Sequence, residues 1–209
     1  MTVLLAAGCG GGKTTSQAEL RLQREDLVAV SHALKSAEGP VANEVAATKL
    51  AWPLVANGLP AHPASSPQSP LAAATRSAAL IQVPALLQDA QAVALTGPAS
   101  QLAALFRSFT GLATRGWQLI GSSTQQIEHG SPAAARFARE NVALYIESVY
   151  DGHFSLAQIG KKLRAGYKRL GGPGAFGGSL TQAEVDALAD VYSEHTDRLH
   201  PHVGARLGS

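Results

Sequence analysis

Hydrophobic residues recur at three- and four-residue steps over most of the chain, which is the spacing of one face of an α-helix. The clearest example begins at Thr96-Gly97-Pro98 and continues through Ile120. Its apolar stripe consists of Leu102, Leu105, Phe106, Phe109, Leu112, Ala113, Gly116 and Ile120. We find no convincing strand, because apolar and polar residues do not alternate over a sustained run. The pattern predicts an all-α fold, a helical bundle of about six helices.

Helix-start signals place a helical pair at the N-terminal end, over residues 16–57. Ser16 and Glu19 have the spacing of a capping box, in which each side chain accepts a hydrogen bond from the other residue's backbone N–H. The first helix is expected over residues 16–37, with Leu20, Leu27 and Leu34 at heptad distance. Pro40 suits the first turn of a second helix.

The middle of the chain contains the clearest linker or loop. Trp52-Pro53 should bend or end the second helix, since proline cannot donate the helical hydrogen bond. Residues 58–70 are rich in Pro and Ser, which favours a linker or long loop over a helix. The main helical domain is therefore expected over residues 71–209, beginning with a helical segment that Pro84 interrupts.

Three further helices are predicted in the C-terminal half. Ser131-Pro132 should begin one of them and Asp151-Gly152 should stop it. Ser155 and Gln158 have capping-box spacing and should begin the next, which Gly171-Gly172-Pro173 closes. A capping pair, Thr181 and Glu184, should begin the last helix.

Basic and acidic residues gather on two successive helices of this half. The basic set is Lys161, Lys162, Arg164, Lys168 and Arg169, and the acidic set is Glu184, Asp186 and Asp190. A helix-turn-helix would use the basic set on DNA phosphates, but the glycine-rich connection between the helices is longer than the usual turn. The acidic helix would also repel DNA. We expect no nucleic-acid partner, and expect the basic face to lie beside the acidic helix and to pair with it.

Composition suits a single medium domain, or a domain plus an extension. The chain has 209 residues, of which 45% are hydrophobic but only 5% aromatic, so its core should consist of closely packed Ala, Leu and Val. A formal net charge of +2 is too small to indicate an anionic partner. One cysteine excludes an intramolecular disulfide, and no apolar run is long enough to span a membrane.

The segment Leu4-Leu5-Ala6-Ala7-Gly8-Cys9 resembles the lipobox of bacterial lipoproteins. In that family the small residues before the cysteine admit the signal peptidase, and the cysteine receives a diacylglyceryl group and becomes the new N-terminus. The resemblance implies lipidation at Cys9, a signal-peptide remnant over residues 1–8 and a flexible spacer over residues 9–15. The signal looks truncated, because no Lys or Arg precedes Cys9.

The same resemblance implies a location and a kind of function. The chain would be anchored by its lipid on the extracytoplasmic face of a bacterial membrane, where its partner would be an envelope protein or a small ligand. We expect a binding or structural role and no cofactor. No catalytic residue is predicted, because the sequence lacks a Gly-x-Ser-x-Gly nucleophile motif and Cys9 is the only thiol.

Two alternatives use other residues. Ala7 to Thr14 matches a relaxed phosphate-loop pattern, in which Lys13 would meet the β- and γ-phosphates of a nucleotide and the Thr14 hydroxyl would bind Mg²⁺. Such enzymes also need a parallel sheet and a strand ending in Asp, and we find neither signal downstream. This reading therefore stays an alternative.

The second alternative is a metal site in the histidine-rich C-terminal segment. His200 and His202 could chelate together, with His195 and Asp197 nearby, and this ligand set suits Zn, Cu or Ni. The spacing matches no structural zinc pattern. His195 also continues the apolar stripe of the last helix, which favours a histidine at the edge of the core. We expect no bound metal and keep these three histidines as the alternative.

Overall fold

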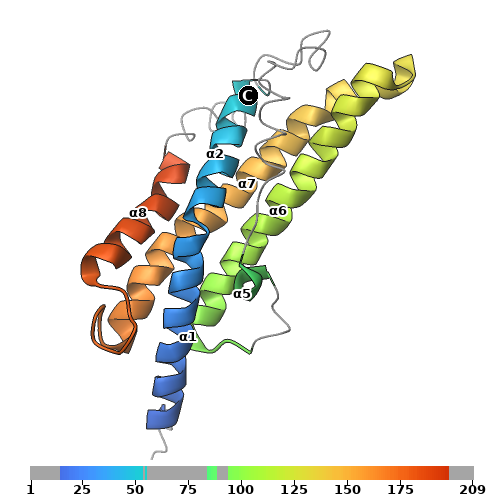
Figure 1. The fold of residues 1–209 in the computed structure, drawn as a ribbon. Helices are drawn as coiled ribbons and strands as arrows, with labels where there is room; N and C mark the ends of the chain where they lie inside the picture. The colour runs from blue at the N-terminus through green and yellow to red at the C-terminus, as the bar shows by residue number, and fades with distance from the viewer. Residues whose placement is uncertain (1–14, 54, 56–83, 89–93, 198–209) are drawn as a thin grey trace, which may run out of the picture.

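A computed structural model describes residues 15–53, 55, 84–88 and 94–197, without the side chains of 194–197. These ranges hold six helices and no strand (Figure 1). The helices are α1 (Gln17–Ser36), α2 (Glu38–Ala51), α5 (Ala85–Gln88), α6 (Gly97–His129), α7 (Pro132–Leu170) and α8 (Gln182–Asp197). The predicted all-α bundle is confirmed. Among the described helices, none has both the length and the apolar composition needed to cross a bilayer.

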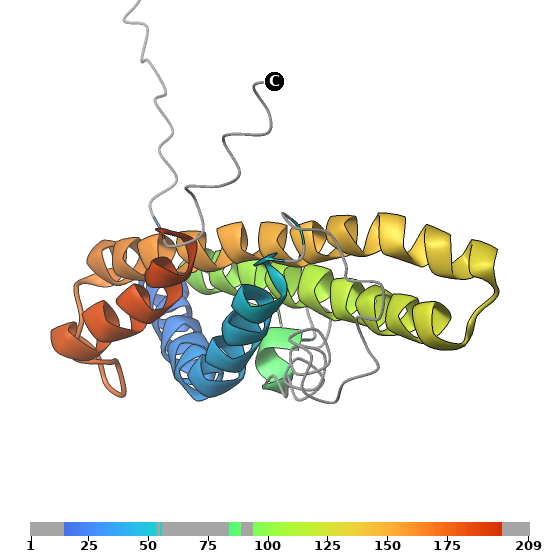
Figure 2. The same ribbon diagram turned by 90° about the horizontal axis from the view of Figure 1, so that it is seen from above.

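A long antiparallel hairpin of α6 and α7 forms the centre of the fold. At 1.5 Å per residue, the two helices are about 50 Å and about 58 Å long. Small residues allow close approach: a β-carbon on Gly116 of α6 would overlap the Val149 side chain of α7, and one on Gly160 would overlap the Ala189 carbonyl of α8. The other described helices, α1, α2, α5 and α8, all lie on one side of this hairpin (Figure 2).

The predicted stop at Asp151-Gly152 is wrong, because α7 continues without a break from Pro132 to Leu170. Gly152 is buried against α6, where a β-carbon would lie 3.3 Å from both the Leu112 β-carbon and the Phe109 carbonyl oxygen. The glycine therefore serves helix–helix packing, which offsets its low helix propensity of about 1 kcal/mol. The expected capping box at Ser155 is wrong for the same reason, since Ser155 lies inside α7.

Several predicted helix ends are confirmed. Ser16 caps α1 through a reciprocal capping box with Glu19. At the end of α7, Gly171 adopts the left-handed conformation (φ 118°) that favours glycine. Thr181 and Glu184 exchange hydrogen bonds at the start of α8. These signals depend on neighbouring residues alone, so the sequence suffices to find them.

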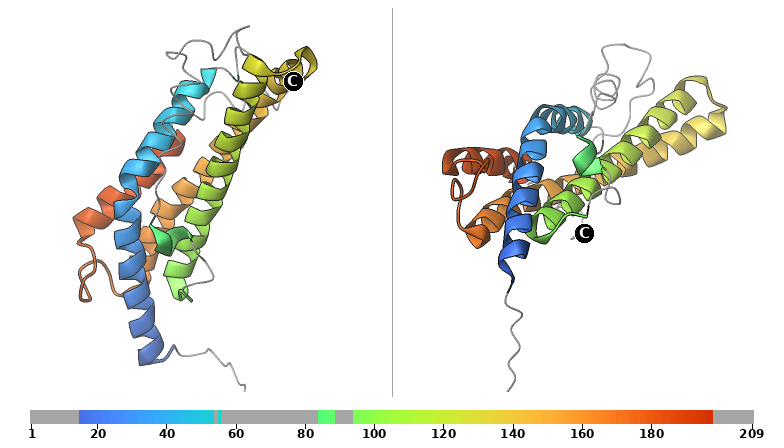
Figure 3. Two further views of the ribbon diagram at one scale, coloured as in Figure 1. Left: turned by 45° about the vertical axis from the view of Figure 1, so that its right-hand side comes forward. Right: turned by 60° about the horizontal axis from the view of Figure 1, so that its bottom comes forward.

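The N-terminal pair of helices is present. α1 and α2 meet at Ala37, and Pro40 lies in the first turn of α2 as expected. The two helices lie across the hairpin at an angle to each other (Figure 3). α2 ends at Ala51, next to Trp52-Pro53 as expected.

α1 and α2 share one hydrophobic core with α6, α7 and α8. Leu27, Leu34 and Val41 are fully buried in the same cluster as side chains from the later helices. Two tyrosine hydroxyls tie α1 to the rest: Tyr167 donates to Ser31 over 3.1 Å, and Tyr192 donates to the Leu34 carbonyl over 2.8 Å. The proposed linker, residues 58–70, lies outside the described residues.

Candidate functional site: a buried carboxylate–histidine network

Most of the site residues predicted from the sequence lie outside the described residues. These are Cys9, Lys13, Thr14, His200 and His202. His195 belongs to the last turns of α8, but its side chain is not described. Within the described ranges, no three His, Cys, Asp or Glu side chains are grouped so that they could hold a metal ion. These ranges also contain no strand of the kind that carries a phosphate loop.

The described residues hold a polar network that the sequence analysis did not predict. Glu44 of α2 and His153 of α7 are both fully buried, and Glu44 Oε2 lies 2.8 Å from His153 Nε2. The other carboxylate oxygen, Oε1, accepts a hydrogen bond from Thr48 Oγ1 at 2.9 Å and one from Trp117 Nε1 at 3.3 Å. His153 Nε2 donates to this carboxylate oxygen in the tautomer that carries hydrogen on that nitrogen. Three helices therefore meet at one carboxylate.

Local sequence explains how each element presents its side chain. Thr48 follows Glu44 by one helical turn, so both project from the same side of α2. Trp117 lies on the stripe of α6 that faces α2, where its indole is buried apart from a small edge. His153 follows Ile146 by seven residues and therefore shares its buried face of α7. Where α2 contacts the hairpin, these side chains form hydrogen bonds at positions that apolar side chains occupy elsewhere in the core.

Aromatic rings enclose the histidine. The ring of Phe109 lies 6.0 Å from that of His153, and the ring of Tyr150 lies 5.7 Å away in an edge-to-face arrangement. Two polar atoms in this region, His153 Nδ1 and Tyr150 Oη, are buried without a hydrogen-bond partner in the described part of the chain. Burial raises the pKa of the Tyr150 hydroxyl, and the neighbouring Asp151 carboxylate adds to this effect. The tyrosine is therefore neutral at physiological pH.

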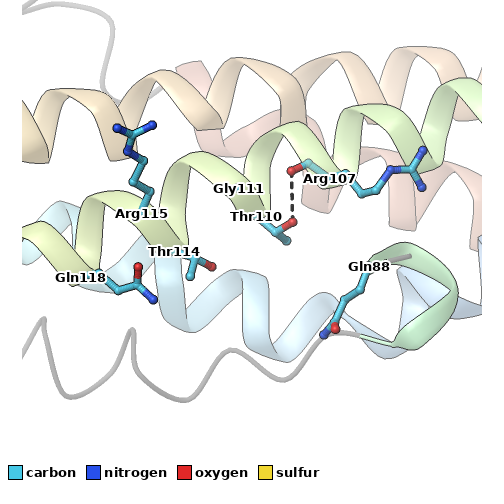
Figure 4. A pocket seen from close by; sticks show the side chains of 7 residues that line it. All are labelled: Gln88, Arg107, Thr110, Gly111, Thr114, Arg115 and Gln118. Atoms are coloured by element: carbon cyan, nitrogen blue, oxygen red, sulfur yellow. Dashed lines mark hydrogen bonds between the residues drawn. The ribbon is translucent and has the colours of Figure 1, made fainter. Parts of the chain in front are cut away.

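A shallow groove of about 480 Å³ runs along α6 beside α5. Its lining is neutral or cationic and contains no carboxylate: Gln88, Arg107, Thr110, Gly111, Thr114, Arg115 and Gln118 (Figure 4). Thr110 donates to the Arg107 carbonyl, and Arg107 Nη1 is buried without a hydrogen-bond partner among the described residues. Amide, hydroxyl and guanidinium donors of this kind suit a small ligand that carries acceptor oxygens.

A second groove lies at the end of α7, around the glycine-rich turn of residues 171–173. Arg164 lines it but is engaged by α8, because its guanidinium contacts Asp186 at 3.1 Å and Asp190 at 2.6 Å. The predicted pairing of the basic face with the acidic helix is thereby confirmed for Arg164, whereas Glu184 of α8 pairs with Lys35 of α1. These two carboxylates also raise the pKa of the Arg164 guanidinium, chiefly through the hydrogen bond to Asp190.

Comparisons of this chain with protein-family models, with curated proteins and with solved structures give no match. Neither groove is lined by Glu44 or His153. The buried network joins α2 to the hairpin, since Glu44 comes from α2, Trp117 from α6 and His153 from α7.

The network left a weak signal in the sequence. Glu44 lies between Val41, Val45 and Thr48 on a helix whose other buried residues are small, and His153 continues the apolar heptad of Ile146. A charged residue on an apolar helix face indicates a buried partner, since an isolated buried charge is very costly. The sequence does not show which partner it meets.

Proposed function

We propose that this chain is a lipid-anchored lipoprotein of the bacterial envelope, whose helical domain has a binding or structural role. The observation that carries the proposal is the lipobox-like segment ending in Cys9, the only thiol of the chain. Lipidation would cap this thiol and attach the chain to the extracytoplasmic face of a membrane. The mature chain would begin at Cys9.

The start of the first helix limits how far the domain can lie from such an anchor. The capping box at Ser16 begins the helical body seven residues after Cys9. Seven residues can span at most about 25 Å, even when fully extended. The helical body would therefore be held close to the membrane surface, within reach of lipid headgroups and of other envelope proteins.

A binding role is supported by the groove beside α5. Among the described residues that line it, none is a carboxylate, histidine or cysteine, so a general base or strong nucleophile is not placed there. Its donors, chiefly Arg107, Gln88 and Gln118, suit recognition of an oxygen-rich or anionic ligand.

The decisive experiment is the mass of the N-terminal peptide from protein made in its native host. We expect a diacylated peptide that begins at Cys9, and membrane-fraction protein that a Cys9→Ser variant loses. A Ser16→Ala variant is the matched control, since it changes the helix cap and leaves the lipobox intact. An unmodified peptide beginning at Met1 or Thr2 would contradict the proposal and would make nucleotide binding at Lys13 the next test.

A further inference from the structure

The basic residues near the end of α7 belong to a part of the chain that has no acidic residue. Asp151 and Glu184 are consecutive acidic residues of the sequence, and the 32 residues between them contain five Lys or Arg. The small net charge of +2 therefore hides a local separation of charge. α6 has no Asp or Glu before Glu128, and its start lies beside the end of α7 in the antiparallel hairpin (Figure 1). Neither helix provides a carboxylate at this end.

Four of these five residues are exposed, and we call them the basic stripe: Lys161, Lys162, Lys168 and Arg169. Residues seven apart point the same way from a helix, so the four side chains form two rows along the last turns of α7. The fifth residue, Arg164, is held by two carboxylates of α8. Among the ion pairs of the described residues, none involves a member of the stripe. Their charges are available to a partner.

The stripe faces away from the helices that pack against α7. In the last turns of α7, Gly160 lies against α8, Gly166 against α6 and Tyr167 against α1. The members of the stripe lie between about 80° and about 200° around the helix from Gly160, at 100° per residue. This side of α7 is therefore open to a flat surface, which could contact all four cations at once.

The stripe lies at the end of the bundle where α1 begins. Arg24 of α1 donates to the Leu170 carbonyl at the end of α7 over 3.0 Å, so these two helix ends are neighbours (Figure 1). Ser16 precedes Arg24 by eight residues, which is about 12 Å of helix. The seven residues from Cys9 to Ser16 span at most about 25 Å. A lipid on Cys9 would therefore hold the stripe close to the headgroups of the same membrane.

A groove of about 520 Å³ adjoins the stripe at the glycine-rich turn. Lys168 and Arg164 line it, and the described residues around it include no carboxylate. Gly171 and Gly172 take left-handed conformations there (φ 118° and 92°), so bare backbone forms part of the wall. Because Arg164 is already engaged by α8, Lys168 is the cation that a ligand in this groove would meet. A phosphate group suits the position, since a lysine ammonium binds phosphate as a point charge.

We propose that the basic stripe binds the headgroups of anionic phospholipids, and that the groove beside Lys168 receives a headgroup phosphate. The proposal rests on the proposed function for the position of the membrane, and adds an electrostatic contact to the lipid anchor. Each Lys or Arg near an anionic surface strengthens binding by about fivefold. This attraction is screened over about 10 Å at 0.1 M salt, so it depends strongly on ionic strength.

The test is co-sedimentation of vesicles with the full chain carrying Cys9→Ser, which has no site for the lipid. We expect binding to vesicles with about 30% phosphatidylglycerol at about 0.1 M salt, loss of this binding at about 0.5 M, and none to pure phosphatidylcholine. Lys162→Gln/Arg169→Gln should weaken the binding about 25-fold, at about fivefold for each charge removed. Lys49→Gln/Arg136→Gln is the matched control, because it removes two exposed charges on α2 and at the start of α7 and should leave binding unchanged.

A Lys162→Arg/Arg169→Lys variant keeps both charges and should bind as the Cys9→Ser chain does. Equal binding to both kinds of vesicle, binding to neither, or full binding by the double Gln variant would overturn the proposal. Tighter binding to a DNA duplex than to the anionic vesicles at the same salt would also overturn it, because the stripe would then serve a nucleic acid. The tested chain carries no lipid, so this result and the mass of the N-terminal peptide can fail independently.

Discussion

Replacing Glu44 by alanine tests the energetic role of the buried network directly. The substitution removes the acceptor of Trp117 Nε1 and His153 Nε2, both of which are buried. Thr48 keeps its hydrogen bond to the backbone carbonyl of residue 44, at 3.2 Å. Each buried donor left without an acceptor costs about 1–3 kcal/mol, so the loss of both hydrogen bonds should cost about 3–5 kcal/mol in total. We expect Glu44→Ala to lower the free energy of unfolding by this amount.

A double variant distinguishes the loss of an interaction from the loss of packing. In Glu44→Leu/His153→Leu both members of the pair are apolar, and only the Trp117 N–H is left without an acceptor. One unsatisfied buried donor costs about 1–3 kcal/mol. The double variant should therefore be more stable than Glu44→Ala, although it carries one more substitution. If the double variant lost as much stability as Glu44→Ala or more, the side chains would act mainly through their shape.

Urea denaturation followed by circular dichroism and by tryptophan fluorescence, from Trp52 and Trp117, measures these differences. For a domain of this size, 3–5 kcal/mol corresponds to a fall in melting temperature of roughly 6–20 °C. Glu140→Ala is the control, since Glu140 is exposed and lies 3.8 Å from Arg136, and it should leave stability unchanged. A loss of less than about 1 kcal/mol in the free energy of unfolding of Glu44→Ala would contradict the prediction, because Glu44 and His153 would then be in contact with water in solution.

Two further predictions concern packing and pH. Gly116→Ala should lower the free energy of unfolding by about 1–3 kcal/mol, because its β-carbon would overlap Val149. Gly111→Ala has open space around it and should raise the free energy of unfolding by up to about 1 kcal/mol. Equal melting temperatures for the two variants would contradict this prediction. A hydrogen bond from the Lys35 ammonium, supported by Thr181, lowers the pKa of Glu184 from 4.5 to about 2. The contribution of Glu184 to stability should therefore be complete above pH 4.5 and disappear as the pH falls to 2. Urea titrations at a series of pH values measure it. A Glu184→Gln variant whose stability falls with pH in the same way as that of the unchanged protein would disprove the prediction.

The helix ends of this protein were predictable because their signals are local. The reciprocal hydrogen bonds of Ser16 with Glu19, and the left-handed turn at Gly171, involve residues within one turn of each other. The pairing of Arg164 with α8 was also predictable, since a basic and an acidic helix follow each other directly. The lipobox resemblance at Cys9 also depends on neighbouring residues alone, and the lipidation that it implies stays a prediction.

Local signals were misleading where tertiary contacts compete with them. Asp151-Gly152 has the composition of a helix stop, yet α7 continues through it because Gly152 lets α6 approach closely. No local pattern reports that the missing β-carbon faces Phe109 of another helix. The expectation of a new helix at Ser155 was wrong for the same reason.

The sequence by itself determined the helical class, most helix boundaries and the candidate anchor, because each follows from residues that are neighbours in the chain. Only the tertiary structure showed that Glu44 meets His153, 109 residues away, and that Trp117 joins them. It also decided how deeply each apolar residue is buried: Phe109 is fully buried, while Leu112, three residues later on the same stripe, is 36% exposed beside Gly152 of α7. The physical reason is that periodicity defines the direction in which a side chain points from its helix, whereas burial depends on which other helix lies in that direction.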